Sequence, residues 1–140
     1  MSPLTVAASW PDAEFVERTR LAVVAGEHLP PTWLIIRRSD GMVIGDCGWR
    51  AGPDPDGSVE IGYHLVAAVR RRGYGAEAVG ALLTRTLATP GVARVAAVVG
   101  VGNLASRQLL LRLGFRLERV GEGHEHYVID GCGPGRPPKR

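Results

Sequence analysis

This sequence contains few cysteines, few aromatic residues and no long apolar run. Only two of its 140 residues are cysteines, Cys47 and Cys132, which is too few for the disulfide framework of a small secreted domain. No apolar stretch reaches the ~18–20 residues that a membrane-spanning helix needs. The first residues also lack the basic region followed by an apolar stretch that marks a secretory signal peptide. These absences predict a cytoplasmic protein that has no membrane partner.

The charge of the chain is modest and locally clustered. The net charge of +3 comes largely from Arg70–Arg72 and the C-terminal residues, whereas a nucleic-acid-binding protein usually spreads basic and aromatic residues over one face. We therefore expect no nucleic-acid partner, and an anionic small molecule explains the cluster better. A hydrophobic share of 45% fits one globular domain with a sizeable core. We place this domain at residues 1–130, followed by a disordered tail at 131–140.

A strand that leads into a helix through a loop rich in arginine and glycine dominates the middle of the chain. Apolar and polar residues alternate over Val59–Val66, which indicates a strand, and a helical period runs from Tyr74 to Pro90. The loop contains Arg70-Arg71-Arg72-Gly73-Tyr74-Gly75. Unpaired helix amides, glycines that allow close approach and fixed positive charges together favour a phosphate or pyrophosphate ligand. The alternative is an arginine-rich surface turn before an ordinary helix.

A second strand and helix follow directly. Val92–Val101 has the composition of a buried strand, and Asn103 and Ser106 begin a leucine-rich helix that ends at Leu113-Gly114-Phe115. Asparagine and serine are common helix caps, which by itself explains both residues. The remaining predicted elements are a helix after Asp12, strands at Thr32–Arg38, Met42–Arg50 and Phe115–Val120, and a last strand at His124–Asp130.

Both patterns resemble the GCN5-related N-acetyltransferase (GNAT) family. Arg70-x-x-Gly73-x-Gly75 is similar to the signature that holds the pyrophosphate of acetyl-CoA, and Asn103-x-x-Ser106 with the later Leu-Gly-Phe is similar to the branch that acetylates ribosomal proteins. The resemblance implies a mixed α/β fold, with a mostly antiparallel sheet whose central parallel strands splay apart between flanking helices. It implies acetyl-CoA as cosubstrate. The residues expected to contact it are Leu65, Val66, Arg70, Arg71, Arg72, Gly73, Tyr74, Gly75, Ala76, Asn103 and Ser106.

The implied reaction moves an acetyl group to a primary amine by direct attack on the thioester. Such an attack needs a base for the amine proton and a main-chain N–H for the developing oxyanion. By resemblance, the amides of Leu65 and Val66 pair with the pantetheine arm, and one of them polarises the thioester. Glu60 is the expected base and His64 the second candidate. The alternatives are a solvated strand glutamate and a hydrogen-bonded, partly buried histidine.

The residue that donates a proton to the departing thiolate differs from the family's usual one. Many family members carry a tyrosine seven residues after the asparagine, but Leu110 stands there. Ser106 is the nearest polar substitute, so we assign it a catalytic role as well as cofactor contact. Tyr127 alternates with hydrophobic residues and is predicted to be structural. His124 and His126 share a strand face, but no residue of matching spacing completes a metal site, so no metal is expected.

The segment before Trp33 has room for one helix, whereas the family begins with a strand and two helices. We therefore expect the first strand to be poor or absent, and an open sheet edge that a second copy would cover, giving a homodimer. Three function classes are consistent with the sequence: an N-acetyltransferase, a non-catalytic acyl-CoA-binding module, and an interaction or nucleic-acid domain that uses the basic loop. A protein N-terminus and a small amine both remain as acceptors.

Overall fold

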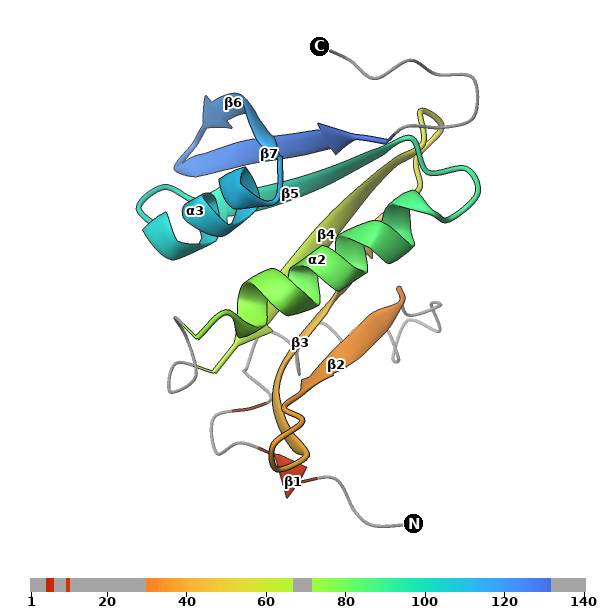
Figure 1. Ribbon diagram of the computed structural model, residues 1–140. Coiled ribbons are helices and arrows are strands. Elements are labelled where there is room, and N and C mark those ends of the chain that lie inside the picture. Colours follow the sequence, from red (N-terminus) through yellow and green to blue (C-terminus); the bar gives the residue numbers. More distant parts are fainter. Residues whose placement is uncertain (1–4, 7–9, 11–29, 67–71, 132–140) are drawn as a thin grey trace, which may run out of the picture.

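The computed structural model describes residues 5–6, 10, 30–66 and 72–131 (Figure 1). The helix predicted after Asp12, the loop arginines Arg70 and Arg71, and residues 132–140 of the predicted tail lie outside the described residues. Within the described ranges, no helix is long and apolar enough to cross a membrane.

The described residues form one mixed sheet with two helices, as the sequence predicted (Figure 1). The strands follow the order β1-β3-β4-β5-β7-β6, and β2 also pairs with β3. Neighbouring strands are antiparallel except for β1 with β3 and β4 with β5. The elements are β1 (Thr5–Val6), β2 (Thr32–Ile36), β3 (Met42–Ala51), β4 (Ser58–Leu65), α2 (Tyr74–Leu87), β5 (Arg94–Gly100), α3 (Leu104–Arg112), β6 (Arg116–Gly121) and β7 (His124–Asp130).

The first strand is short, as the sequence suggested. Its two residues pair in parallel with Met42 and Val43, at the beginning of β3. The pairing between β2 and β3 is longer. These two strands form an antiparallel hairpin around Ser39-Asp40-Gly41, and both were predicted as strands. The arrangement leaves β3 as the strand that connects the N-terminal part of the sheet to β4.

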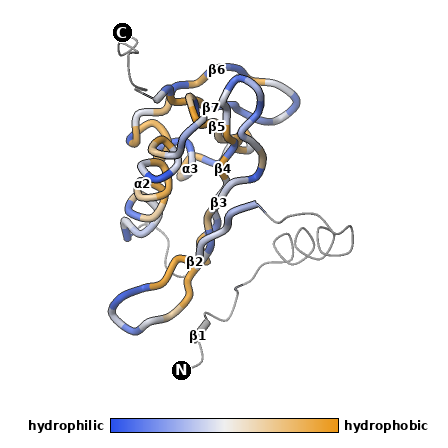
Figure 2. Tube along the Cα trace, turned by 90° about the vertical axis from the view of Figure 1, so that its right-hand side faces the viewer, coloured by the Kyte–Doolittle hydropathy of each residue, from blue (hydrophilic) through white to orange (hydrophobic). Residues whose placement is uncertain are grey.

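Both helices cover the same face of the sheet, as the edge-on view in Figure 2 shows. Because side chains alternate along a strand, Val59 and Ile61 of β4 point to this face, where they are 0% and 2% exposed. The side of α2 that faces them is also buried, through Val79, Leu82, Leu83 and Thr86. Thr86 is the polar residue of this apolar layer, and its hydroxyl is hydrogen-bonded on both sides. It donates to the Leu82 carbonyl at 2.7 Å and accepts from Trp49 Nε1 of β3 at 3.0 Å.

The parallel strands β4 and β5 are hydrogen-bonded over only part of their length and then diverge. Ladder pairs join the two strands from Ser58↔Arg94 to Ile61↔Ala97. Beyond that point β4 continues against β3 as far as Leu65, and β5 continues against β7 as far as Gly100. Among the described residues, no ladder pair connects the last part of β4 to β5. The predicted splay is therefore present, and its closed end lies at Ile61.

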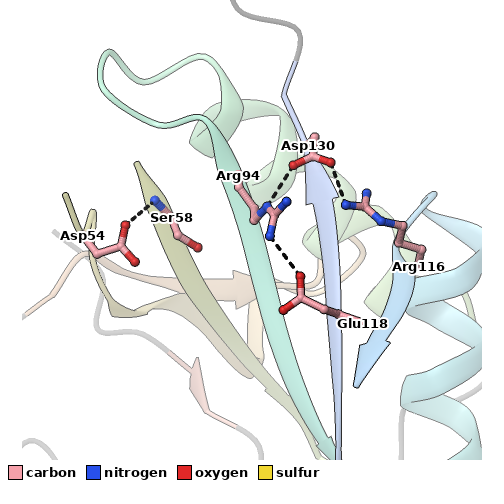
Figure 3. Close-up of polar contacts among 6 residues, drawn as sticks. All are labelled: Asp54, Ser58, Arg94, Arg116, Glu118 and Asp130. Atoms are coloured by element: carbon pink, nitrogen blue, oxygen red, sulfur yellow. Dashed lines mark hydrogen bonds and ion pairs between the residues drawn. The ribbon is translucent and has the colours of Figure 1, made fainter. Parts of the chain in front are cut away.

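A network of ion pairs holds the sheet at the opposite end from the splay (Figure 3). Arg94 at the start of β5 donates to Asp130 Oδ1 on β7 and to Glu118 Oε2 on β6, both at 2.9 Å. Arg116 Nη2 lies 2.8 Å from the other oxygen of Asp130. Partial burial works to raise the pKa of Asp130, but the two guanidinium groups outweigh it and lower that pKa below its ordinary value.

We expect Asp130→Asn to lower the free energy of unfolding by about 1.5–3 kcal/mol near neutral pH, the range for a hydrogen bond to a charged group. Because the folded-state pKa is lowered, this stability is present above the unfolded-state pKa of ~3.9 and disappears as pH falls through the folded value. Denaturant unfolding at several pH values should show the two proteins converging below about pH 4. Asp56→Asn, in an exposed loop, serves as the control. An unchanged difference in strong acid would contradict this explanation.

Candidate active site

Three elements meet at the open end of the splay: the end of β4, the first turn of α2 and the middle of α3. They meet around Gly75, where a Cβ would lie 3.3 Å from Leu65 Cδ1 and 3.6 Å from Leu109 Cδ2. Gly75 thus brings the backbone of α2 close to both neighbours. The predicted phosphate loop and the predicted pantetheine strand are therefore adjacent in space.

The N-terminus of α2 keeps the features that favour an anion. Gly73 is the N-cap residue and has φ 83°, a left-handed conformation that glycine adopts without steric cost. Among the described residues no side chain caps this helix end, and the amides of its first turn point outward with the positive end of the helix dipole. Arg72 is exposed beside them. Of the predicted loop, the structure thus describes Arg72 to Ala76.

The main chain of β4 corrects one expectation about the pantetheine contacts. The Val66 N–H donates to the Ile44 carbonyl at 2.9 Å, so that amide is already committed to β3. Because strand residues alternate the direction of their main-chain polar groups, Tyr63 and Leu65 direct theirs to the side where β5 diverges. The expected role of the Leu65 main chain is consistent with this direction, and that of the Val66 N–H is not.

Asn103 and Ser106 lie at the start of α3, as predicted. The Asn103 side chain accepts from the Ser106 N–H at 3.2 Å, so the capping interpretation is confirmed for Asn103, the N-cap residue. The Ser106 hydroxyl has a second contact, because it shares a short hydrogen bond with the Tyr63 hydroxyl. Burial raises the pKa of the Tyr63 phenol, and the bond to Ser106 offsets this only in part. The Ser106 N–H is therefore capped by Asn103, while the Ser106 hydroxyl reaches across to β4.

Sequence reasoning missed Tyr63. It counted this residue only as one of the inward-pointing positions of its strand. The available signal was its polar tip: a tyrosine within the otherwise aliphatic series of Val59, Ile61 and Leu65 needs a hydrogen-bond partner when partly buried. Leu110, at the position where many family members carry a tyrosine, is 0% exposed and belongs to the core. The structure thus brings a phenol to the mouth of the splay from a different element.

The candidate bases lie on the other face of the sheet. Glu60 and His64 alternate with Tyr63, so their side chains point away from the two helices. Glu60 is opposite Ala96, inside the paired part of β4 and β5, whereas His64 is opposite Asp46 and level with the splay. The two candidates therefore share a face, but His64 is nearer to the open end.

Other polar residues of this face were not predicted. Asp46 is only 4% exposed and accepts a hydrogen bond from Trp10 Nε1 at 2.7 Å. A Cβ at Gly62 would collide with the Arg50 guanidinium, which places that cation along the strand between Glu60 and His64. The face opposite the helices thus carries both signs of charge close to the splay.

The remaining candidates lie on β7. Tyr127 is 1% exposed and donates to Glu125 Oε1 at 3.3 Å, which confirms its structural role. Glu125 also lies 3.3 Å from Arg107 of α3. His124 and His126 occupy neighbouring positions of one strand face, and no group of three or more His, Cys, Asp or Glu suited to a metal occurs among the described residues.

Comparison with known proteins places this geometry in a family. Residues 3–116 match the model of the acetyltransferase (GNAT) domain. The chain is 30% identical over 124 residues to the uncharacterized N-acetyltransferase YjdG of Bacillus subtilis (strain 168), an alignment covering 85% of this chain and 74% of that protein.

Two solved structures show the same fold. The ribosomal-protein-S5-alanine acetyltransferase from Vibrio fischeri has a TM-score of 0.66 at 16% identity, over 84% of this chain and 69% of that one. The N-acetyltransferase PseH from Campylobacter jejuni, solved in complex with acetyl coenzyme A, has a TM-score of 0.66 at 16% identity, over 85% and 81%. At these identities the likeness shows the fold alone. Because the family model covers most of the sequence and the splayed sheet agrees with it, the chain belongs to the GNAT acetyltransferase family.

Proposed function

We propose that this protein transfers the acetyl group of acetyl-CoA to a primary amine by direct attack of the amine on the thioester. The observation that supports this most is the splay between β4 and β5. It opens beside the N-terminus of α2, whose N-cap is Gly73, and a Cβ at Gly75 in that first turn would be 3.3 Å from Leu65 Cδ1. An open strand side can accept an extended ligand much as a sheet accepts another strand. The acetyl-CoA complex of PseH is consistent with such a ligand.

Each part of the cofactor then has a partner. The pyrophosphate binds the amides of residues 71–76 at the start of α2, where Arg70 and Arg71 are close in sequence. The pantetheine arm enters between β4 and β5 and pairs with the main chain near Leu65. Asn103 and Ser106 border the arm from the side of α3.

The two faces of the sheet divide the chemistry. Glu60 and His64 lie on one face and Ser106 on the other, so an amine can approach from the first while the thiolate departs toward the second. In this proposal Glu60 removes the amine proton directly or through a water molecule, and His64 is the alternative base. Cys47 does not offer a covalent route, because burial and the neighbouring Asp46 charge raise the pKa of its thiol to about 11. Protonated thiols are poor nucleophiles.

The acceptor we propose is a protein N-terminus or a small primary amine. The similarity of Asn103-x-x-Ser106 and Leu113-Gly114-Phe115 to the ribosomal-protein-acetylating branch favours the first, and the fold shared with the Vibrio fischeri enzyme agrees with it. The second candidate function is a non-catalytic acyl-CoA-binding module. Leu110 favours it, because this position lacks the tyrosine that many catalytic members use.

A titration followed by an amine panel tests the proposal. A ligand that binds only the native state stabilises it by RT ln(1 + [L]/Kd), or about 2.7 kcal/mol at 100 times Kd, so acetyl-CoA should raise the unfolding midpoint clearly. Thiol release should then appear with peptides bearing a free N-terminus or with small amines. Stabilisation without thiol release for any amine would favour the binding module, and no stabilisation would contradict both functions.

A further inference from the structure

A pair of hydrogen-bonded hydroxyl groups connects β4 to α3 beside the gap between the two splayed strands. Tyr63 comes from β4, two residues beyond the last ladder pair with β5, and Ser106 comes from the first turn of the helix that follows β5. Their hydroxyls are hydrogen-bonded to each other. The bond joins residues 43 positions apart in the sequence, so it exists only because the strands diverge and α3 folds back over the gap.

The position of this pair along β4 corresponds to the far end of the proposed pantetheine arm. The phosphate end of the cofactor lies near Gly75, where an added Cβ would be 3.3 Å from Leu65 Cδ1. From there the arm can extend along β4 only toward Ile61, where the ladder with β5 closes the gap. Tyr63 lies between these two residues, roughly 6.6 Å from each along the strand. The reactive sulfur, at the end of the arm, should therefore stop beside the pair.

The pair has one hydrogen left for a ligand. Two hydroxyls carry two hydrogens, and the bond between them uses one, so the other can point at a sulfur in the gap. The phenol is the better donor of the two because it is the stronger acid. Its raised pKa keeps it protonated at the pH at which amines react. When Ser106 donates to the phenol oxygen, it polarises the phenol O–H further.

We propose that Tyr63 is a catalytic residue whose hydroxyl donates a hydrogen bond to the departing thiolate of CoA, with Ser106 as the residue that positions it. The role rests on the proposed function and goes beyond it, since that proposal gives Tyr63 no part in the reaction. In this step the amine nitrogen bonds to the carbonyl carbon, the C–S bond breaks and its electron pair leaves on sulfur. The amine proton goes to the base, Tyr63 keeps its own proton, and solvent protonates the thiolate after release.

The decisive test measures the pH dependence of binding, which does not require the acceptor to be known. A hydrogen bond to the charged form lowers a pKa, so bound CoA should ionise below the ordinary thiol value of ~8.5. In calorimetric titrations from about pH 6 to about pH 10, the ratio of CoA affinity to acetyl-CoA affinity should rise by about 10-fold or more. Acetyl-CoA lacks the thiol and cancels the other pH effects.

Variants separate Tyr63 from Ser106 and from general stability. Tyr63→Phe should bind acetyl-CoA within a few-fold of wild type and lose the rise in the affinity ratio. It should lower turnover by about 10²–10³-fold, comparable with removal of one transition-state donor. Ser106→Ala should give an affinity ratio and a turnover between those of wild type and Tyr63→Phe, because the phenol remains but is less well oriented. Tyr127→Phe removes a buried phenol hydroxyl away from the gap and should behave as wild type. Unfolding midpoints of all three confirm that the proteins are folded.

The outcomes are distinct. If Tyr63→Phe keeps the wild-type pH dependence of CoA binding, the inference about Tyr63 is wrong, although the proposed function stands whenever wild type releases thiol with an amine. If only Ser106→Ala removes the pH dependence, Ser106 is the donor and Tyr63 merely ties β4 to α3. If wild type binds neither CoA nor acetyl-CoA, the proposed function fails and this inference fails with it.

Discussion

Replacing Gly75 by glutamate should abolish acetyl-CoA binding. The new side chain would start 3.3 Å from Leu65 Cδ1 and 3.6 Å from Leu109 Cδ2, and it would carry a negative charge into the helix end that we assign to the pyrophosphate. Like charges placed together in an interface cost several kcal/mol, so affinity should fall by about 100-fold or more. Calorimetry with acetyl-CoA, on protein shown to be folded by circular dichroism, measures this.

Two control variants separate the charge effect from a general defect of the helix. Gly75→Ala adds only the Cβ, which meets the mobile end of a leucine side chain, and should keep most of the affinity. Gly80→Glu places the same charge farther along α2, where the nearest contact of a Cβ is Leu113 at 3.6 Å, and should bind acetyl-CoA normally. If Gly75→Glu retains wild-type affinity, the pyrophosphate does not bind at this helix end.

Glu60→Gln should lower turnover near neutral pH by ~10²–10⁴-fold, the usual contribution of a general base. The change keeps the shape of the side chain and removes the proton acceptor. Acetyl-CoA affinity should not change, since the start of α2 is untouched. The loss should shrink as pH approaches the pKa of the amine, ~8 for an N-terminus or ~10.4 for a lysine, because more of the amine is then already neutral.

The measurement is a pair of pH–rate profiles with whichever amine the panel identifies. Glu122→Gln, in the exposed turn between β6 and β7, provides a matched glutamate control. Profiles of wild type and Glu60→Gln that stay within a few-fold of each other at every pH would remove Glu60 from the mechanism. His64→Gln would then become the decisive variant, because His64 lies closer to the open end of the splay.

Local patterns in the sequence predicted most of the fold. The alternation before Tyr74 and the helical period after it predicted both elements, β4 to within one residue and the C-terminal end of α2 to within about three, because each period reflects one buried face. The cap formed by Asn103 was predicted for a similar reason, since the asparagine and the Ser106 amide that it accepts from are three residues apart. Such features depend on neighbours in the sequence and can be predicted from it.

The contacts that define the candidate site were decided by the tertiary structure. The sequence could not show that the Val66 amide is committed to β3, because that depends on the register between β3 and β4. It placed Glu60 ahead of His64 by resemblance, but it could not show that His64 lies nearer the open end, because that depends on where the ladder between β4 and β5 closes.

The Tyr63–Ser106 bond is the clearest case. The sequence by itself determined a strand with a tyrosine, a helix capped by Asn103 with a serine in its first turn, and a glycine-rich loop. Only the divergence of β4 from β5 and the return of α3 over the gap brought the two hydroxyls together. Residue type and period specify which face a side chain occupies, whereas contacts between distant segments depend on the packing of the whole chain.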